Sequence, residues 1–374
     1  MERKVLFTAS TYSHIRSFHL PYLERFRAAG WQVHVACGGK KMDIPGADKV
    51  FHLPLKKSMI APGNFWAAAQ LRGLIRREGY DLVTAHTSLA SFFTRLAVLG
   101  PGRRPKVVGV VHGFLFDENS PAWKRRILLT AERMVAPVTD LMLTMDRSDY
   151  DMARRHGLGK RVTFIPGMGV DFAQLDTAAD MGEDLRRELG IAADATVLFF
   201  AGEFSKNKSQ NVLIRAMQLL PERVVLVLAG EGTRLERCRS LARELGVNDR
   251  VHFPGYVRDV GRWYAAADVV VPSSRSEGLP FNVMEAMYCG LPVVASAVKG
   301  HVDLVRHEEN GLLYPYGDHV ACARAVERLI NDPELACRLG EQAAGSVADY
   351  NLDRVGDIVF AQYQSCVKEP AVNF

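Results

Sequence analysis

Two acidic residues, Glu277 and Glu285, stand eight positions apart around the predicted start of a helix. The short β-branched run at 268–271 predicts a buried parallel strand before them, and Gly278 and Pro280 predict a turn and a first helical turn. Backbone N–H groups at a helix start bind anions, because the helix dipole is positive there. Carboxylates repel phosphate but accept hydrogen bonds from sugar hydroxyls. The pattern therefore favours a nucleotide-sugar site, with a capped, charged surface helix as the open alternative.

A dense series of short motifs continues from these acids to Leu304. They are Glu277-Gly-Leu-Pro280, Met284-Glu-Ala-Met287, Cys289-Gly-Leu-Pro-Val-Val-Ala-Ser296 and Gly300-His-Val-Asp-Leu304. This series resembles retaining glycosyltransferases of family 4. Further similar stretches lie at 201–216, 227–232 and 253–256 and, more weakly, at 111–114 and 165–171. The resemblance implies an α/β fold of the GT-B type, with two facing Rossmann-like domains, parallel sheets and a C-terminal helix that crosses back to the first domain.

The resemblance also implies roles for individual residues. Glu277 would bind the donor sugar, Glu285 the ribose and Lys208 the diphosphate, while His112 would lie near the transferred sugar. The catalytic residues expected on this basis are Glu277, His112 and Lys208. The expected donor-binding residues are Gly202, Glu203, Lys208, Tyr256, Val257, Gly278, Leu279, Pro280, Phe281, Asn282 and Glu285.

Lys208 follows the predicted strand 197–201 by a short loop, at the edge where open α/β sheets bind ligands. A lysine there can neutralise a leaving diphosphate without a metal, with Lys206 nearby to assist, and a solvated loop lysine is the alternative. Many family members carry an arginine where Glu203 stands, and an acid cannot replace it as a phosphate ligand. Glu203 would then face the acceptor or a sugar hydroxyl. We expect no metal and no cofactor.

The acceptor side is expected to lie in the first half of the chain. His112 ends the predicted strand 107–111 and would point into the interdomain cleft, with a buried core histidine as the alternative. His14 and Arg16 lie in the predicted loop after the first strand, the usual acceptor side. The glycine-rich form of this loop that the family carries is missing here.

Composition is that of a soluble enzyme with two domains. The chain has 374 residues, 48% of them apolar, which is enough for two full cores. It contains no run of eighteen apolar residues, and its first residues predict a strand, not a signal sequence. Six cysteines are scattered without a C-x-x-C pair, which argues against a zinc site and for reduced thiols in the cytoplasm.

Charge is distributed unevenly along the chain. The first 175 residues hold 26 basic and 14 acidic side chains, whereas the rest is acidic overall. Such an asymmetry indicates an anionic partner for the first half, and no nucleic-acid-binding motif accompanies it. Two stretches, 56–66 and 123–129, mix basic and aromatic residues as membrane-surface segments do. We therefore expect peripheral association with the inner face of the plasma membrane and no nucleic-acid partner.

Alternating strand and helix patterns run through the whole chain and predict parallel sheets covered on both faces. The predicted strands lie at 5–9, 33–36, 82–85, 107–111, 141–144, 162–165, 197–201, 224–229, 251–253, 269–272 and 293–296. We expect an acceptor and membrane-facing domain at 1–170, a donor domain at 171–352, and a crossover helix with a tail at 353–374. A polar break at 167–181 is the predicted linker.

Within the family the motifs most resemble members that build capsular, exopolysaccharide or O-antigen repeats. That resemblance implies transfer of a sugar from UDP-HexNAc or UDP-hexose to a polyprenyl-diphosphate-linked saccharide in cell-surface polysaccharide synthesis. An NAD-dependent oxidoreductase is disfavoured, because the first strand lacks the glycines that allow the backbone to approach a pyrophosphate. A nucleotide-sugar epimerase with the same fold stays open. So does a non-catalytic subunit that only binds nucleotide.

Overall fold

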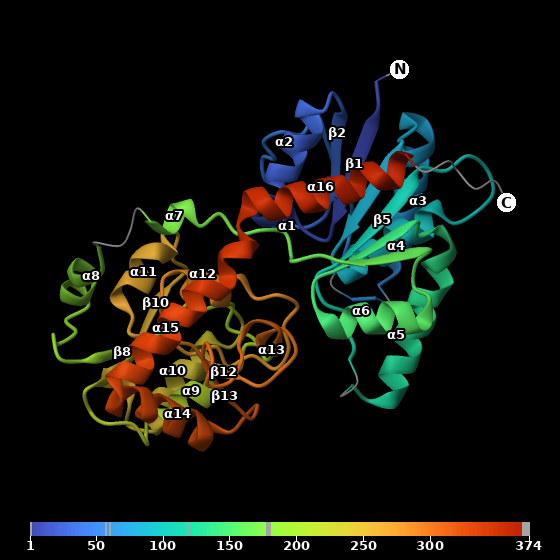
Figure 1. Ribbon diagram of the computed structural model, residues 1–374. Coiled ribbons are helices and arrows are strands. Elements are labelled where there is room, and N and C mark those ends of the chain that lie inside the picture. The colour runs from blue at the N-terminus through green and yellow to red at the C-terminus, as the bar shows by residue number, and fades with distance from the viewer. Residues whose placement is uncertain (1, 57, 60, 118–119, 177–180, 369–374) are drawn as a thin grey trace. The chain divides into compact units, whose positions relative to one another are not determined.

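The computed structural model describes residues 2–56, 58–59, 61–117, 120–176 and 181–368 (Figure 1). The chain forms two compact units. Unit 1 contains residues 1–169 and 353–374, and unit 2 contains residues 170–352. Each unit is built on parallel strands, as the alternating patterns predict.

Unit 1 holds a seven-stranded parallel sheet in the order β3-β2-β1-β4-β5-β6-β7. The strands are β1 (Lys4–Ala9), β2 (Gln32–Cys37), β3 (Lys49–His52), β4 (Leu82–His86), β5 (Lys106–Val111), β6 (Leu141–Thr144) and β7 (Arg161–Phe164). The helices are α1 (Tyr12–Phe18), α2 (Leu20–Ala28), α3 (Pro62–Glu78), α4 (Ser88–Val98), α5 (Ala122–Val135), α6 (Arg147–His156) and α16 (Leu352–Lys368), with a 3-10 turn at Ala136–Val138. The central strands are buried almost throughout, which explains their continuous apolar runs.

The order of strands in unit 1 reverses between β1 and β4. From β1 the chain adds β2 and β3 on one side, and from β4 it adds β5, β6 and β7 on the other. Loops that leave neighbouring strands in opposite directions open a crevice at the carboxyl ends of those strands, where α/β proteins bind their ligands. The loop after β1 and the ends of β4 and β5 are therefore the expected site in this unit.

Unit 2 has a sheet in the order β10-β9-β8-β11, which a bridge between Val270 and Val293 extends to β12 and β13. The strands are β8 (Thr196–Ala201), β9 (Val224–Ala229), β10 (Val251–Gly255), β11 (Val269–Val270), β12 (Val294–Ser296) and β13 (Leu312–Tyr314). The helices are α7 (Ala173–Asp176), α8 (Gly182–Glu188), α9 (Asn211–Ala216), α10 (Leu235–Glu244), α11 (Val260–Ala266), α12 (Phe281–Tyr288), α13 (His301–Leu304), α14 (His319–Asn331) and α15 (Pro333–Val347), with 3-10 turns at Asn248–Arg250 and Ala348–Tyr350. Here the order reverses between β8 and β11.

The last helix, α16, packs in unit 1 beside α2, as Figure 1 shows. The buried ring of Tyr363 packs against Tyr22 and Phe26, and Arg25 forms an ion pair with Asp357. The predicted return of the C-terminal helix to the first domain is confirmed.

One local expectation was wrong. His14 and Arg16 lie in helix α1 and not in a loop, because the Thr11 side chain accepts a hydrogen bond from the backbone N–H of His14 and so caps a helix start. The predicted linker at 167–181 contains the boundary between the two units, after residue 169, and the short helix α7, and its residues 177–180 lie outside the described residues. Among the helices of the described part of the chain, none is long and apolar enough to span a bilayer.

Candidate functional site

An ion pair between Lys208 and Glu277 lies at the strand-order reversal of unit 2. Lys208 follows β8 and Glu277 follows β11, and because these parallel strands are neighbours, their loops meet at one edge of the sheet. Lys208 Nζ lies 2.8 Å from Glu277 Oε1, and the two side chains are 21% and 14% exposed. The fold thus brings together two predicted site residues that are 69 positions apart.

Hydrogen bonds between the two loops hold this ion pair in place. The side-chain amide of Asn207 donates to Ser276 O at 2.8 Å, and the backbone N–H of Arg275 donates to Asn207 O at 2.7 Å. The Ser273 hydroxyl donates to Lys208 O at 2.8 Å. The lysine and the carboxylate therefore stand on one rigid element, which is what a preorganised electrostatic site requires.

A glycine behind Glu277 fixes the position of its loop. Gly300 has φ +84°, and a Cβ added there would lie 2.6 Å from Gly278 O and 2.7 Å from Glu277 Cβ. The backbone N–H of Glu277 donates to Lys299 O at 3.0 Å. No larger residue fits at position 300 without moving Glu277. The sequence analysis used this glycine only as part of a motif.

Two further glycines support the loop that follows β8. A Cβ at Gly230 would lie 2.1 Å from Gly202 O, and one at Gly232 would lie 2.4 Å from Phe204 O. Both have positive φ, so both conformation and space require glycine. The simplest explanation of the Gly-x-Gly pattern at 230–232 is a tight turn. In the structure it allows the backbone after β9 to approach the backbone after β8 closely. The aliphatic chain of Lys208 lies over Gly202, which is one of the expected donor-binding residues.

Helix α12 begins at Phe281, four positions after Glu277. Gly278 and Leu279 lead to Pro280 at the N-cap position, and among the described residues no side chain caps this start. The Asn282 amide donates to Ala201 O at 2.9 Å and so anchors the helix start to the end of β8. The predicted helix start is therefore present, with Phe281 as its first residue and the Asn282 side chain engaged in this anchor.

Glu285 lies one turn further along α12 and is largely removed from solvent. The Tyr264 hydroxyl donates to its Oε2 at 2.9 Å. Burial raises the pKa of the Glu285 carboxyl, and the hydrogen bond from Tyr264 offsets part of that rise. The structure thus gives Glu285 a protein partner in addition to the ribose contact that the sequence predicts.

The remaining donor-side residues lie at the carboxyl ends of β8 and β10. The exposed Glu203 accepts a hydrogen bond on its backbone oxygen from the Gln210 amide at 3.1 Å. Tyr256 is 71% exposed just after β10, while Val257 packs against the core beneath α12. The backbone N–H of Gly230 donates to Gly255 O at 2.7 Å and joins the loop after β9 to the end of β10.

His301 lies near Glu277 and Lys208 and was not singled out by the sequence analysis. It is buried at the start of α13, its Nδ1 lies 2.9 Å from Ser296 O, and its Nε2 has no hydrogen-bond partner among the described residues. Burial lowers its pKa, and the nearby charge of Glu277 works in the opposite direction. The motif that begins at Gly300 contains this histidine, so a motif position was the only signal for it.

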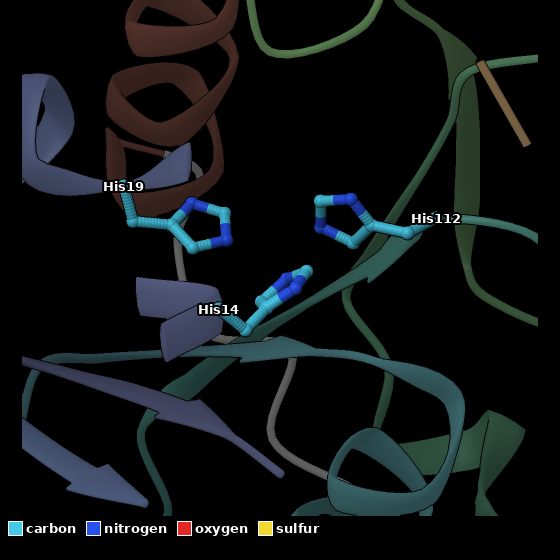
Figure 2. A group of neighbouring side chains, drawn as sticks. All are labelled: His14, His19 and His112. Atoms are coloured by element: carbon cyan, nitrogen blue, oxygen red, sulfur yellow. The ribbon is translucent and has the colours of Figure 1, made fainter. Parts of the chain in front are cut away.

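In unit 1 the structure brings His112 and His14 together. His112 follows β5, and its ring centroid lies 4.6 Å from that of His14 in α1 (Figure 2). His19 and His86, which the sequence analysis did not single out, lie beside them. Arg16 is exposed, and its guanidinium donates to Asp43 O at 3.3 Å, so it does not join this group.

Two family models and a curated relative match the chain. The family model "Glycosyltransferase Family 4" matches residues 22–173, and "Glycosyl transferases group 1" matches residues 182–345. EpsD of Bacillus subtilis (strain 168), a protein named as a glycosyltransferase, is 34% identical over 384 residues, which covers 100% of both chains.

Two solved structures share the fold over nearly the whole chain. HepE of Anabaena, in complex with UDP and glucose, has a TM-score of 0.80 at 21% identity and covers 97% of this chain and 100% of its own. WaaG, a glycosyltransferase involved in lipopolysaccharide biosynthesis, has a TM-score of 0.77 at 18% identity, with 95% and 98% covered. The GT-B fold predicted from the sequence is confirmed. The chain belongs to glycosyltransferase family 4, and it transfers a sugar from a nucleotide-sugar donor.

Proposed function

We propose that the chain is a retaining hexosyltransferase or N-acetylhexosaminyltransferase whose unit 2 binds a UDP-sugar. The observation that carries this proposal is the Lys208–Glu277 ion pair beside the start of α12. Lys208 and the helix start face the diphosphate, and the Glu277 carboxylate accepts hydrogen bonds from the donor sugar. The complex of HepE with UDP and glucose supports UDP as the nucleotide.

In this reaction the bond between the anomeric carbon and the β-phosphate oxygen breaks, and the acceptor oxygen bonds to the same face of the sugar. The acceptor proton passes to an oxygen of the leaving phosphate. Glu277 is a poor candidate for a covalent nucleophile, because its carboxylate is already paired with Lys208 at 2.8 Å. Front-side attack therefore fits these residues better than a double displacement.

Charge neutralisation in this proposal comes from the protein itself. Lys208 and the N-terminus of α12 offset the negative charge that develops on the leaving diphosphate. His112 of unit 1 would approach the transferred sugar. We expect transfer to proceed without Mg²⁺ or Mn²⁺.

The acceptor that we propose is a polyprenyl-diphosphate-linked saccharide of cell-surface polysaccharide synthesis, reached from the cytoplasmic face of the membrane by unit 1. Helix α5 supports this, because Trp123, Ile127 and Met134 are 68%, 61% and 53% exposed on one side of it. Arg126 and Arg133 are exposed on the same helix. Aromatic, aliphatic and basic side chains together suit the headgroup layer of an anionic membrane.

A second segment adds to that surface. Phe65 and Trp66 are exposed near the start of α3, and Met59 lines a small pocket together with Leu128 of α5. Lys57 and Ile60 of the same predicted membrane stretch lie outside the described residues. The role of WaaG in lipopolysaccharide biosynthesis supports a surface polysaccharide as the product class.

The test is incubation of the full chain with a panel of UDP-sugars, with and without a polyprenyl-diphosphate-linked saccharide. Acceptor-dependent release of UDP, with the product anomer that of the donor, is the expected result. Interconversion of the sugar without an acceptor would identify an epimerase, and an inverted product would refute retention. Absence of any turnover with the whole panel would leave a binding subunit as the better description.

A further inference from the structure

Four histidines meet in unit 1, away from the charged pair of unit 2. His86 ends β4, His112 follows β5, His14 lies in α1 and His19 is the N-cap residue of α2. Ring centroids lie 5.1 Å apart for His14 and His19, and 5.5 Å apart for His19 and His112. Figure 2 shows the rings of His14, His19 and His112 turned toward a common space.

Several ring nitrogens of this group are buried without a partner. The Nε2 atom of His14 and both nitrogens of His19 have no hydrogen-bond partner among the described residues. Buried polar atoms are almost always satisfied, and an exception indicates an ion, a water or a catalytic role at that place. Unpartnered nitrogens on two neighbouring rings form a stronger indication than one alone.

Imidazole is the side chain best suited to a transition metal. A neutral ring presents one lone pair, and histidine is the commonest metal ligand in proteins.

We propose that His14, His19 and His112 bind one divalent transition-metal ion of the zinc class. One ring nitrogen from each residue lies within 4.8 Å of the others. A tetrahedral zinc ion with bonds of about 2.1 Å needs ligand nitrogens about 3.4 Å apart, so the rings close by roughly an ångström on binding. Three histidines leave a fourth position for water, and imidazole nitrogens select against Mg²⁺ and Ca²⁺, which prefer oxygen.

Neighbouring side chains orient the site as outer-shell groups do in metal centres. Nδ1 of His86 lies 3.4 Å from Nε2 of His112, and Nε2 of His86 lies 3.0 Å from the Thr84 hydroxyl. That hydroxyl donates to the Tyr363 oxygen of α16 at 3.2 Å. The side chains of His14 and His112 are partly exposed, whereas His19 is buried.

The histidines are invisible as a motif, because 93 positions separate His19 from His112 and only the parallel sheet brings them together. The expectation that sugar transfer needs no metal concerns the donor diphosphate. The ion proposed here is held by unit 1 alone. An ion on His112 engages a ring that would otherwise approach the transferred sugar.

The experiment is titration of the EDTA-treated, dialysed full chain with Co²⁺, followed by the visible absorption of the bound ion, and then displacement by Zn²⁺. We expect one ion per chain and no competition from Mg²⁺. His14→Ala and His19→Ala should each weaken binding about 100-fold or more, since even loss of an outer-shell partner costs 10- to 100-fold. His319→Ala, in α14 of unit 2, is the matched control and should bind as the parent does.

A thermal measurement guards against a variant that folds poorly. Zn²⁺ should raise the melting temperature of the parent and of His319→Ala, because binding to the folded state alone stabilises it, and should not raise that of a folded His14→Ala chain. Absence of Co²⁺ binding to the parent, or equal affinity in the parent and both histidine variants, would overturn the proposal and leave a water among the rings.

Discussion

Replacing Glu277 with Gln tests whether the two charged residues of the donor site have different roles. Glu277 should control the rate of transfer, and Lys208 should control nucleotide binding. Glu277 and Lys208 are paired at 2.8 Å and mostly shielded from water. Two unit charges about 4 Å apart near a protein surface interact by about 4 kcal/mol before desolvation, and a hydrogen bond to a charged group contributes about 1.5–3 kcal/mol net. The carboxylate therefore restrains a lysine that the diphosphate also needs.

The expected outcome has opposite signs for the two readouts. Transfer should fall by about 100-fold or more, or about 2.7 kcal/mol of barrier, because the contact with the donor sugar strengthens in the transition state. UDP affinity should stay constant or rise by up to about tenfold, or about 1.4 kcal/mol, since Lys208 no longer shares its charge. Lys208→Met, in contrast, should weaken UDP binding by about 1.5–3 kcal/mol and lower transfer as well.

The assay pairs initial rates of UDP release, at saturating donor and acceptor, with calorimetric UDP binding for both single variants and the double variant. Because the two residues touch, the effects of Glu277→Gln and Lys208→Met should not add. Transfer by Glu277→Gln within a few-fold of the parent would remove Glu277 from the site. A loss of UDP affinity as large as that of Lys208→Met would refute the division of roles.

Four further outcomes are expected. Gly300→Ala should lower transfer at least tenfold with little change in overall melting temperature, because its Cβ would push against the Glu277 loop, and a parent-like rate would contradict this. Glu285→Gln should weaken nucleotide binding. Burial raises the folded-state pKa of this acid, so its contribution to stability is present at low pH and is lost as pH rises through that pKa. The glutamine variant does not ionise. Its melting temperature relative to that of the parent should therefore be higher at pH 8 than at pH 5. Transfer should survive excess EDTA and be inhibited by Zn²⁺, whereas strict dependence on added Mg²⁺ or Mn²⁺ would show that the charge assignment is wrong. Co-sedimentation with vesicles should require anionic lipid, weaken with salt, and drop in Arg126→Ser/Arg133→Ser but not in Arg243→Ser of α10; equal pelleting with neutral vesicles would exclude the membrane surface.

The sequence predicted the central strands of both sheets because buried parallel strands are continuous apolar runs, as in β5 and β9. It missed β3, whose residues are mostly exposed, and β13, which has only three residues. Neither carries the long apolar run or the alternation on which such predictions rest. It also missed α1, where a single capping threonine and not a hydrophobic period starts the helix.

The candidate site, like the fold, could be predicted from the sequence only in part. Glu277 and the helix start could be predicted because they are neighbours in the chain, so their spacing alone carries the geometry. The contact of Glu277 with Lys208 could not, because it depends on β8 and β11 being adjacent strands. The requirement for glycine at Gly230 and Gly300 is likewise tertiary, since it comes from backbone atoms of distant loops.

The two strand-order reversals of this enzyme carry opposite chemistry, and this bears on how an acceptor is recognised. The reversal in unit 2 presents an ammonium and a helix N-terminus, which suit an anionic donor. The reversal in unit 1 presents imidazoles whose pKa values burial lowers well below the usual range, so they gain little from a diphosphate but can contact an uncharged sugar hydroxyl or a soft cation. If the acceptor is a lipid-linked diphosphate, its charge must therefore be met by basic groups other than these histidines. The exposed arginines of α5, which lie among aromatic and aliphatic side chains, are residues of unit 1 with the chemistry for that contact.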